Sequence, residues 1–270
     1  MRSGLRHTFF NPNLVFVIGI FLLIYDSGIR KFCENMYETG NTANIFEGFV
    51  FCTNSWLYLM MLGMGFIILI IDTPASDSED RFLIIRTGRK AWLFGETLRI
   101  VTASALYTLG FFVFSLLEML PYVDVSNRWS YYTVNFEARY METVPNGSHY
   151  IPVEVFRFYL PKTAALHSLL LLFIGFVDLG LIILFFSVIK IKIVGLLIDI
   201  VSILGIIFFN NVKKSMAWLL PFSHTQLSLH NTYVFKKLSF PLHWSYLYLC
   251  ILGLCILGMS FAVLKKKDFG

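Results

Sequence analysis

This sequence predicts an all-α integral membrane fold, on three observations. First, the 270 residues are 57% hydrophobic and only 14% charged, with a mean hydropathy of +0.69, whereas soluble domains carry about 25% charged residues. Second, several apolar runs approach the roughly 20 residues that a helix needs to cross about 30 Å of hydrocarbon. Third, no stretch between these runs has the composition of a separate soluble domain. We therefore expect a single transmembrane domain over residues 1–270.

Six transmembrane helices are expected, and the chain order gives their topology. The spans are predicted at residues 13–29, 48–71, 100–117, 163–189, 193–209 and 244–264. Each must be a helix because lipid offers backbone groups no hydrogen-bonding partner, and the runs are too long for barrel strands. An even number of spans places both termini on one side. The short inner loops and the three lysines at 265–267 carry basic residues close to span ends, which favours cytoplasmic termini.

The most charged stretch of the chain lies between the second and third predicted spans. Ser76 and Glu79 have the spacing of a capping box, which predicts a helix start. Gly88 is typical of a helix end, and the residues between have one apolar side. We expect a short amphipathic helix at the cytoplasmic face, followed by a second helix that starts near Trp92. Such a helix either rests on lipid headgroups or binds in the groove of a partner protein.

This layout resembles the permease subunit of type-2 ATP-binding-cassette exporters. The resemblance is carried by "SEDRFLIIRTGRKAWLFGETL" at 78–98 and by "LKKKDFG" at 264–270. The loop "AWLLPFSHTQLSL" within 213–241 matches the short re-entrant helices that the family has between its last two spans. The segment at 118–162 is longer than the family pattern and leaves the outer architecture open.

The resemblance implies a function, partners and a docking site. The 77–92 segment would be a coupling helix that binds a separate ATP-binding cassette subunit, where ATP hydrolysis takes place. A second permease copy or a homologous permease would complete the path through the membrane of a bacterial cell. The implied contacts with the ATPase are made by Asp77, Glu79, Arg81, Phe82, Ile85, Arg86, Arg89 and Trp92.

Three acidic residues fall inside predicted spans. An intramembrane carboxylate is costly, so it normally faces protein or water and often marks a functional position. Asp178 and Asp199 are therefore candidates for the translocation path. The structural alternative is an interhelical hydrogen bond for Asp178, and for Asp199 an ion pair with Lys192 or a side chain that snorkels to the inner face. Asp26 lies four residues before Arg30, which predicts an ion pair at the end of the first span.

Several function classes lack their signatures. The chain has no GxxxxGK[ST], HExxH or GxSxG motif, so we expect no ATP site, no enzyme activity and no cofactor. The cysteines and histidines lack the spacing of metal ligands, and no basic surface run suits nucleic acid. Two alternatives to the exporter subunit stay open. One is a membrane interaction protein, such as an immunity or sensor subunit, and the other is an intramembrane enzyme using Asp178 and Asp199.

Overall fold

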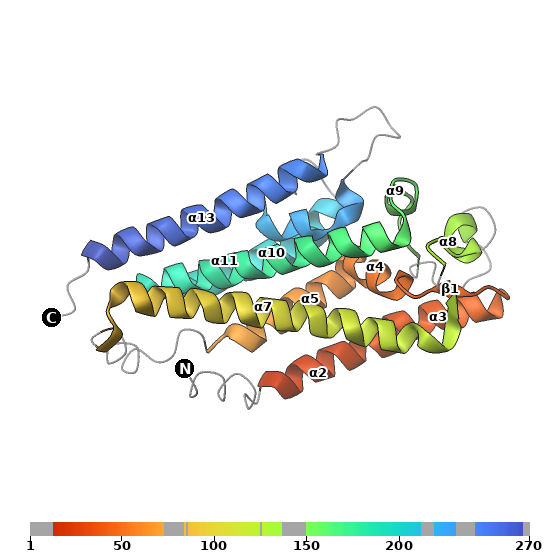
Figure 1. The fold of residues 1–270 in the computed structure, drawn as a ribbon, viewed down its shortest axis with the longest axis horizontal. Helices are drawn as coiled ribbons and strands as arrows, with labels where there is room; N and C mark the ends of the chain where they lie inside the picture. Colours follow the sequence, from red (N-terminus) through yellow and green to blue (C-terminus); the bar gives the residue numbers. More distant parts are fainter. Residues whose placement is uncertain are drawn as a thin grey trace.

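The computed structural model describes residues 13–72, 84, 86–124, 126–136, 150–211, 219–230 and 241–266. Long helices lie side by side along one axis and run in alternating directions (Figure 1). They are α2 (Asn13–Ile24) continuing through η1 (Tyr25–Ile29) into α3 (Arg30–Glu38), α4 (Glu47–Asn54) with α5 (Trp56–Ile70), α7 (Arg89–Met119), α10 (Pro161–Val188), α11 (Lys192–Asn211) and α13 (Leu242–Lys266).

Short elements connect the long helices. They are β1 (Ala43–Asn44), β2 (Val123–Asp124), η2 (Leu120–Tyr122), α8 (Tyr131–Asn135), α9 (Val153–Phe156), η4 (Pro221–Thr225) and η5 (Leu227–Leu229). The start of α2 and the end of α13 lie at the same end of the molecule, on the left in Figure 1. We call this the terminal end, and we call the opposite end, where α3 and α7 finish, the loop end.

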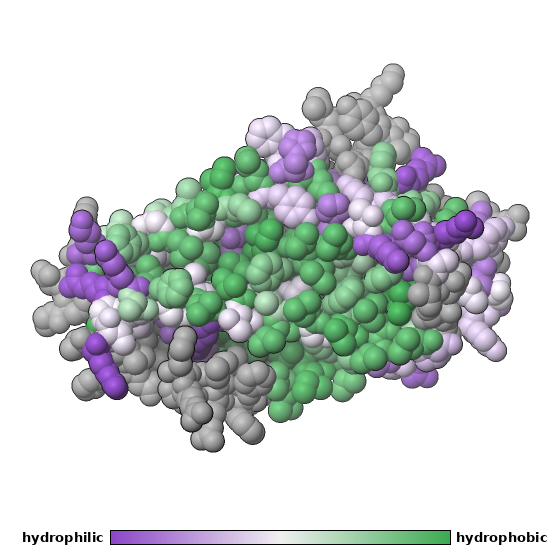
Figure 2. All heavy atoms as spheres, in the orientation of Figure 1, coloured by the Kyte–Doolittle hydropathy of each residue, from purple (hydrophilic) through white to green (hydrophobic). Residues whose placement is uncertain are grey.

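The apolar surface of the helices fits a membrane protein. Within the described residues, four helices are long and apolar enough to cross a membrane, at 13–38, 89–119, 161–188 and 242–265, and the bent pair α4–α5 makes a fifth if it counts as one span. Hydrophobic residues cover the middle of the molecule, and hydrophilic residues gather toward its two ends (Figure 2). This distribution matches an apolar zone between two aqueous phases.

Helix α10 forms the centre of the bundle. It packs against α7, α11 and α13, and 61% of its most apolar window is buried, against 28% for the windows of the first and last candidate spans. Close packing between α10 and α7 depends on Gly180, because a Cβ atom there would collide with the Cγ2 of Ile100. The core around α10 includes a stack of Phe66 on Phe176, with ring centroids 4.6 Å apart.

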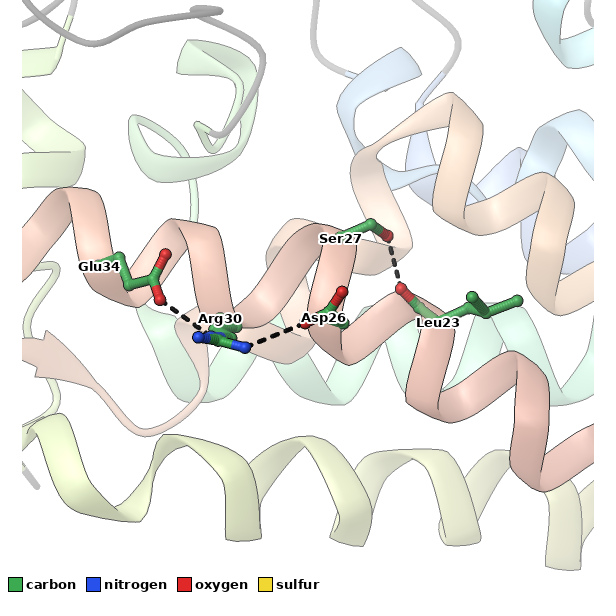
Figure 3. A network of polar contacts seen from close by, with 5 residues as sticks. All are labelled: Leu23, Asp26, Ser27, Arg30 and Glu34. Carbon is green, nitrogen blue, oxygen red and sulfur yellow. Dashed lines mark hydrogen bonds and ion pairs between the residues drawn. The ribbon is translucent and has the colours of Figure 1, made fainter.

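The first helix is longer than predicted and contains a π-helical turn. The predicted span at 13–29 is the first part of a continuous helix that ends at Glu38. The guanidinium of Arg30 bonds the Asp26 carboxylate at 3.2 Å and the Glu34 carboxylate at 2.9 Å (Figure 3). The predicted Asp26–Arg30 pair is thus confirmed. The two ion pairs lie on the exposed surface of the helix, from the π turn into its polar part.

Candidate functional site

The second predicted span is not one helix, and buried polar residues lie at the point where it breaks. The expectation of a continuous helix over 48–71 was wrong, because α4 and α5 meet at an angle of 84°. Ser55 between them has an extended backbone, with φ −86° and ψ 124°. Thr53 and Asn54 beside the break are buried polar residues in an otherwise apolar run. A break of this kind leaves backbone groups that need partners within the protein.

A segment from the other half of the chain supplies those partners. The Gln226 side-chain amide donates to the backbone carbonyl of Asn54 at 2.8 Å. In the opposite direction, the backbone N–H of Ser228 donates to the side-chain oxygen of Asn54 at 2.8 Å. The Asn54 amide group also donates to the carbonyl of Val50 at 2.8 Å. Residues 221–230 therefore act as a polar plug for the helix break, and we call them the plug segment.

Hydrogen bonds also connect the plug segment to the start of α13. His230 Nδ1 lies 3.1 Å from the Gln226 carbonyl oxygen and 3.2 Å from that of Leu227. A carbonyl only accepts, so Nδ1 carries the proton and the other nitrogen of the neutral ring accepts. The Ser245 hydroxyl then donates to His230 Nε2 at 2.7 Å. Its oxygen accepts from His224 Nδ1 at 2.9 Å.

This chain of groups is sealed inside the protein. His224, His230 and Ser245 are each 0% exposed. Burial lowers the pKa of His230 to about 4, so the ring is neutral near pH 7, and this neutrality sets the hydrogen-bond directions given above. The ring of His224 stacks on Tyr248 of α13, with centroids 4.3 Å apart. The hydrogen bonds of Ser245 to both imidazole rings hold the plug segment against α13.

The two carboxylates predicted to line a path are buried within this one chain. Asp178 is 1% exposed and Asp199 is 0% exposed. Asp178 faces α13 at Gly253, where a Cβ atom would lie 2.7 Å from its Oδ1. Among the described residues, Asp178 Oδ2 and both Asp199 carboxylate oxygens have no hydrogen-bond partner. No hydrogen bond or ion pair in that part of the chain joins the two residues, so they are separate buried acids on α10 and α11.

The predicted docking segment is described only at its end. Asp77, Glu79, Arg81, Phe82 and Ile85 lie outside the described residues. Gly88 has φ +86° and its N–H bonds the Ile84 carbonyl at 2.9 Å, as expected for a glycine that ends a helix.

The next helix, α7, starts at Arg89, three residues earlier than predicted. Arg86 is exposed, and Trp92 is buried in a cluster with residues of α10 and α13. The Arg89 guanidinium donates to the carbonyl oxygens of Leu264 and Lys265, each at 3.1 Å, at the end of α13. Arg89 and Trp92 therefore join the start of α7 to the rest of the chain.

Sequence reasoning missed the plug segment as a unit. The histidines lack the spacing of metal ligands, and no sequence pattern gives a role to His224, His230, Asn54, Gln226 or Ser245. One local signal was present, since "CTNSW" at 52–56 places three polar residues in succession within an apolar run. The partners that Asn54 finds in the plug segment, Gln226 and Ser228, lie 172 and 174 residues away, so no local pattern could identify them.

Comparison with known protein families, curated sequences and solved structures gave no match to this chain. Within the described residues, no three histidine, cysteine, aspartate or glutamate side chains are placed to hold a metal ion. The function is therefore inferred from the residues themselves.

Proposed function

We propose that this chain is the membrane-spanning subunit of an ATP-driven exporter and that it couples to a separate ATP-binding subunit through residues 77–92. In this proposal the chain crosses a bacterial cell membrane six times with both termini in the cytoplasm. The sixth crossing comes from α11, which has 20 residues. The alternating helix directions and the shared position of the two ends of the bundle support an even number of crossings (Figure 1).

The observation that carries the proposal is the link from Arg89 to the end of α13. The 77–92 segment leads directly into α7, and Arg89 connects the first turn of α7 to the last turn of α13. A partner that moves this segment would therefore move two membrane helices together. Both helices pack on α10, so a displacement at the cytoplasmic face would be transmitted to the centre of the bundle.

The buried polar groups offer a route from that movement to transport. Asp178 lies between α10 and α13, and the plug segment is bonded to α13 through Ser245. A shift of α13 would change the surroundings of both. Asp178 and Asp199 are thus proposed to meet the path in a conformation other than the one described here, in which both are buried. A second permease, identical or homologous, would pack on the exposed apolar faces of the helices.

Purification of the detergent-solubilised chain from its native membrane tests the docking. The variant is Arg86→Glu, because Arg86 is exposed, whereas a change at Arg89 would also disturb α13. Lys190→Glu is the matched control, since Lys190 is exposed in the α10–α11 turn at the same end. We expect an ATP-binding subunit to co-purify with the wild type and the control and to be lost from Arg86→Glu. If no ATPase accompanies the wild type, the chain is better explained as a membrane interaction protein such as an immunity or sensor subunit.

The topology is tested separately with one added cysteine at position 86 or 157, in a chain in which the exposed Cys250 and Cys255 are alanine and the buried Cys33 and Cys52 are kept. A membrane-impermeant maleimide applied to intact cells should label position 157 and spare position 86 until the cells are permeabilised. Labelling of both positions in intact cells would contradict the six-span arrangement.

A further inference from the structure

The loop end contains a polar pocket that the proposed transport mechanism does not use. Its cavity volume is about 400 Å³, within the range of small-molecule sites. It is lined by Gly40, Asn41, Thr42, Asn44, Ser126, Arg128, Trp129, Ser130 and Tyr131. These residues come from two segments that follow α3 and α7 and lie more than 80 positions apart in the sequence.

The two segments are fixed to each other by hydrogen bonds behind the pocket. Strands β1 and β2 pair in parallel, with Ala43 opposite Val123. The Asn44 side-chain amide donates to the carbonyl oxygens of Ser126 and Arg128. This pairing makes the pocket a preformed site, so a ligand need not order its walls.

A buried carboxylate completes the support. Glu47 is 0% exposed, and its two oxygens accept the backbone N–H groups of Ser130 at 2.6 Å and Asn44 at 3.3 Å. Both of its oxygens are therefore bonded to the backbone of the two segments. Among the described residues that line the pocket, none is acidic.

The pocket presents a cation, the guanidinium of Arg128. The Arg128 side chain is exposed, and it forms no ion pair or side-chain hydrogen bond with any residue that the structure describes. Trp129 forms part of the wall, where its indole N–H is held by the Tyr159 carbonyl at 2.7 Å. The planar guanidinium presents paired N–H donors that match the oxygens of a phosphate.

We propose that this pocket binds a phosphate group, with Arg128 as its counter-charge and the Thr42 hydroxyl as a second donor. The phosphate belongs either to an anionic lipid headgroup or to a soluble phosphate compound. The pocket lies where two long apolar helices end, beside a tryptophan and a tyrosine, which is the level at which lipid headgroups meet a protein. The site requires neither the ATPase nor the coupling segment, so it stands apart from the proposed function.

Binding is measured on the purified full chain with two probes. The first is phosphatidylglycerol in phosphatidylcholine nanodiscs, counted as retained lipid by native mass spectrometry. The second is inorganic phosphate in lipid-free detergent, measured by tryptophan fluorescence. Each is applied to the wild type, to Arg128→Gln, and to Arg157→Gln as a control, because Arg157 is an exposed arginine at the same end that does not line the pocket.

We expect Arg128→Gln to lose at least tenfold in affinity for one probe and Arg157→Gln to match the wild type. Loss confined to the lipid probe assigns a headgroup site, and loss with inorganic phosphate assigns a soluble ligand. Arg128→Lys keeps the charge without the planar fork and should bind with intermediate affinity, which also covers the case that Arg128→Gln folds poorly. Equal binding by wild type and both glutamine variants, or no binding of either probe, overturns the proposal.

Discussion

Replacing Asn54 by leucine should remove one of the two hydrogen bonds between the helix break and the plug segment, and so lower the stability of the protein. In the wild type the Asn54 side chain donates to Val50 and accepts from Ser228. Leucine fills a similar volume but leaves the N–H of Ser228, a residue 8% exposed, without its acceptor. An unsatisfied buried donor costs about 1–3 kcal/mol. Loss of the amide–carbonyl bond to Val50 adds about 1 kcal/mol, so Asn54→Leu should lower the free energy of unfolding by about 2–4 kcal/mol.

Asn135→Leu is the matched control for this experiment. The Asn135 amide also donates to the carbonyl four residues earlier, at 3.0 Å, but in an exposed setting and with no second partner among the described residues. Equilibrium unfolding in mixed micelles, followed by tryptophan fluorescence, gives the free energy for each variant. The loss of unfolding free energy in Asn54→Leu minus the loss in Asn135→Leu gives the cost of leaving the buried Ser228 N–H without its acceptor. This difference should be about 1–3 kcal/mol. A difference below about 0.5 kcal/mol would refute the view that the plug segment stabilises the break.

Three further results are expected. The buried His230 ring excludes a proton until about pH 4, whereas the unfolded chain binds one below its ordinary value of 6.5. The free energy of unfolding should therefore fall as the pH drops from 6.5 toward 4, by up to about 3 kcal/mol. In His230→Gln the free energy of unfolding should fall less over the same pH range. Gly180→Ala should lower the free energy of unfolding by about 1–3 kcal/mol, because the new Cβ atom collides with Ile100. Gly180→Ala should cost less when Ile100 is already alanine, which a double-mutant cycle measures. Arg30→Ala should keep the wild-type unfolding midpoint because both of its ion pairs are exposed; a clear drop would show that the π turn depends on them.

The sequence was most informative where structure depends on local composition. The predicted spans at 163–189 and 244–264 differ from α10 and α13 by at most two residues at either end. The glycine that ends a helix at 88 was also readable, because a left-handed turn favours glycine at that place. Predictions were poorer at the ends of the first and third helices, since α3 and the start of α7 are polar helical turns that extend beyond the apolar run and hydropathy does not detect them.

By itself the sequence determined that the chain forms long apolar helices and where most of them lie, because burial of apolar surface and the need to satisfy backbone groups act on each run separately. Only the tertiary structure decided that the second run breaks at Ser55, since the compensating groups on Gln226 and Ser228 are supplied from 172 and 174 residues away. The same holds for Asp178, whose surroundings depend on Gly253 of another helix. Likewise Arg128 lines a pocket because a strand pair brings two distant loops together. Such partners are fixed by packing in three dimensions, which no pattern within a single run encodes.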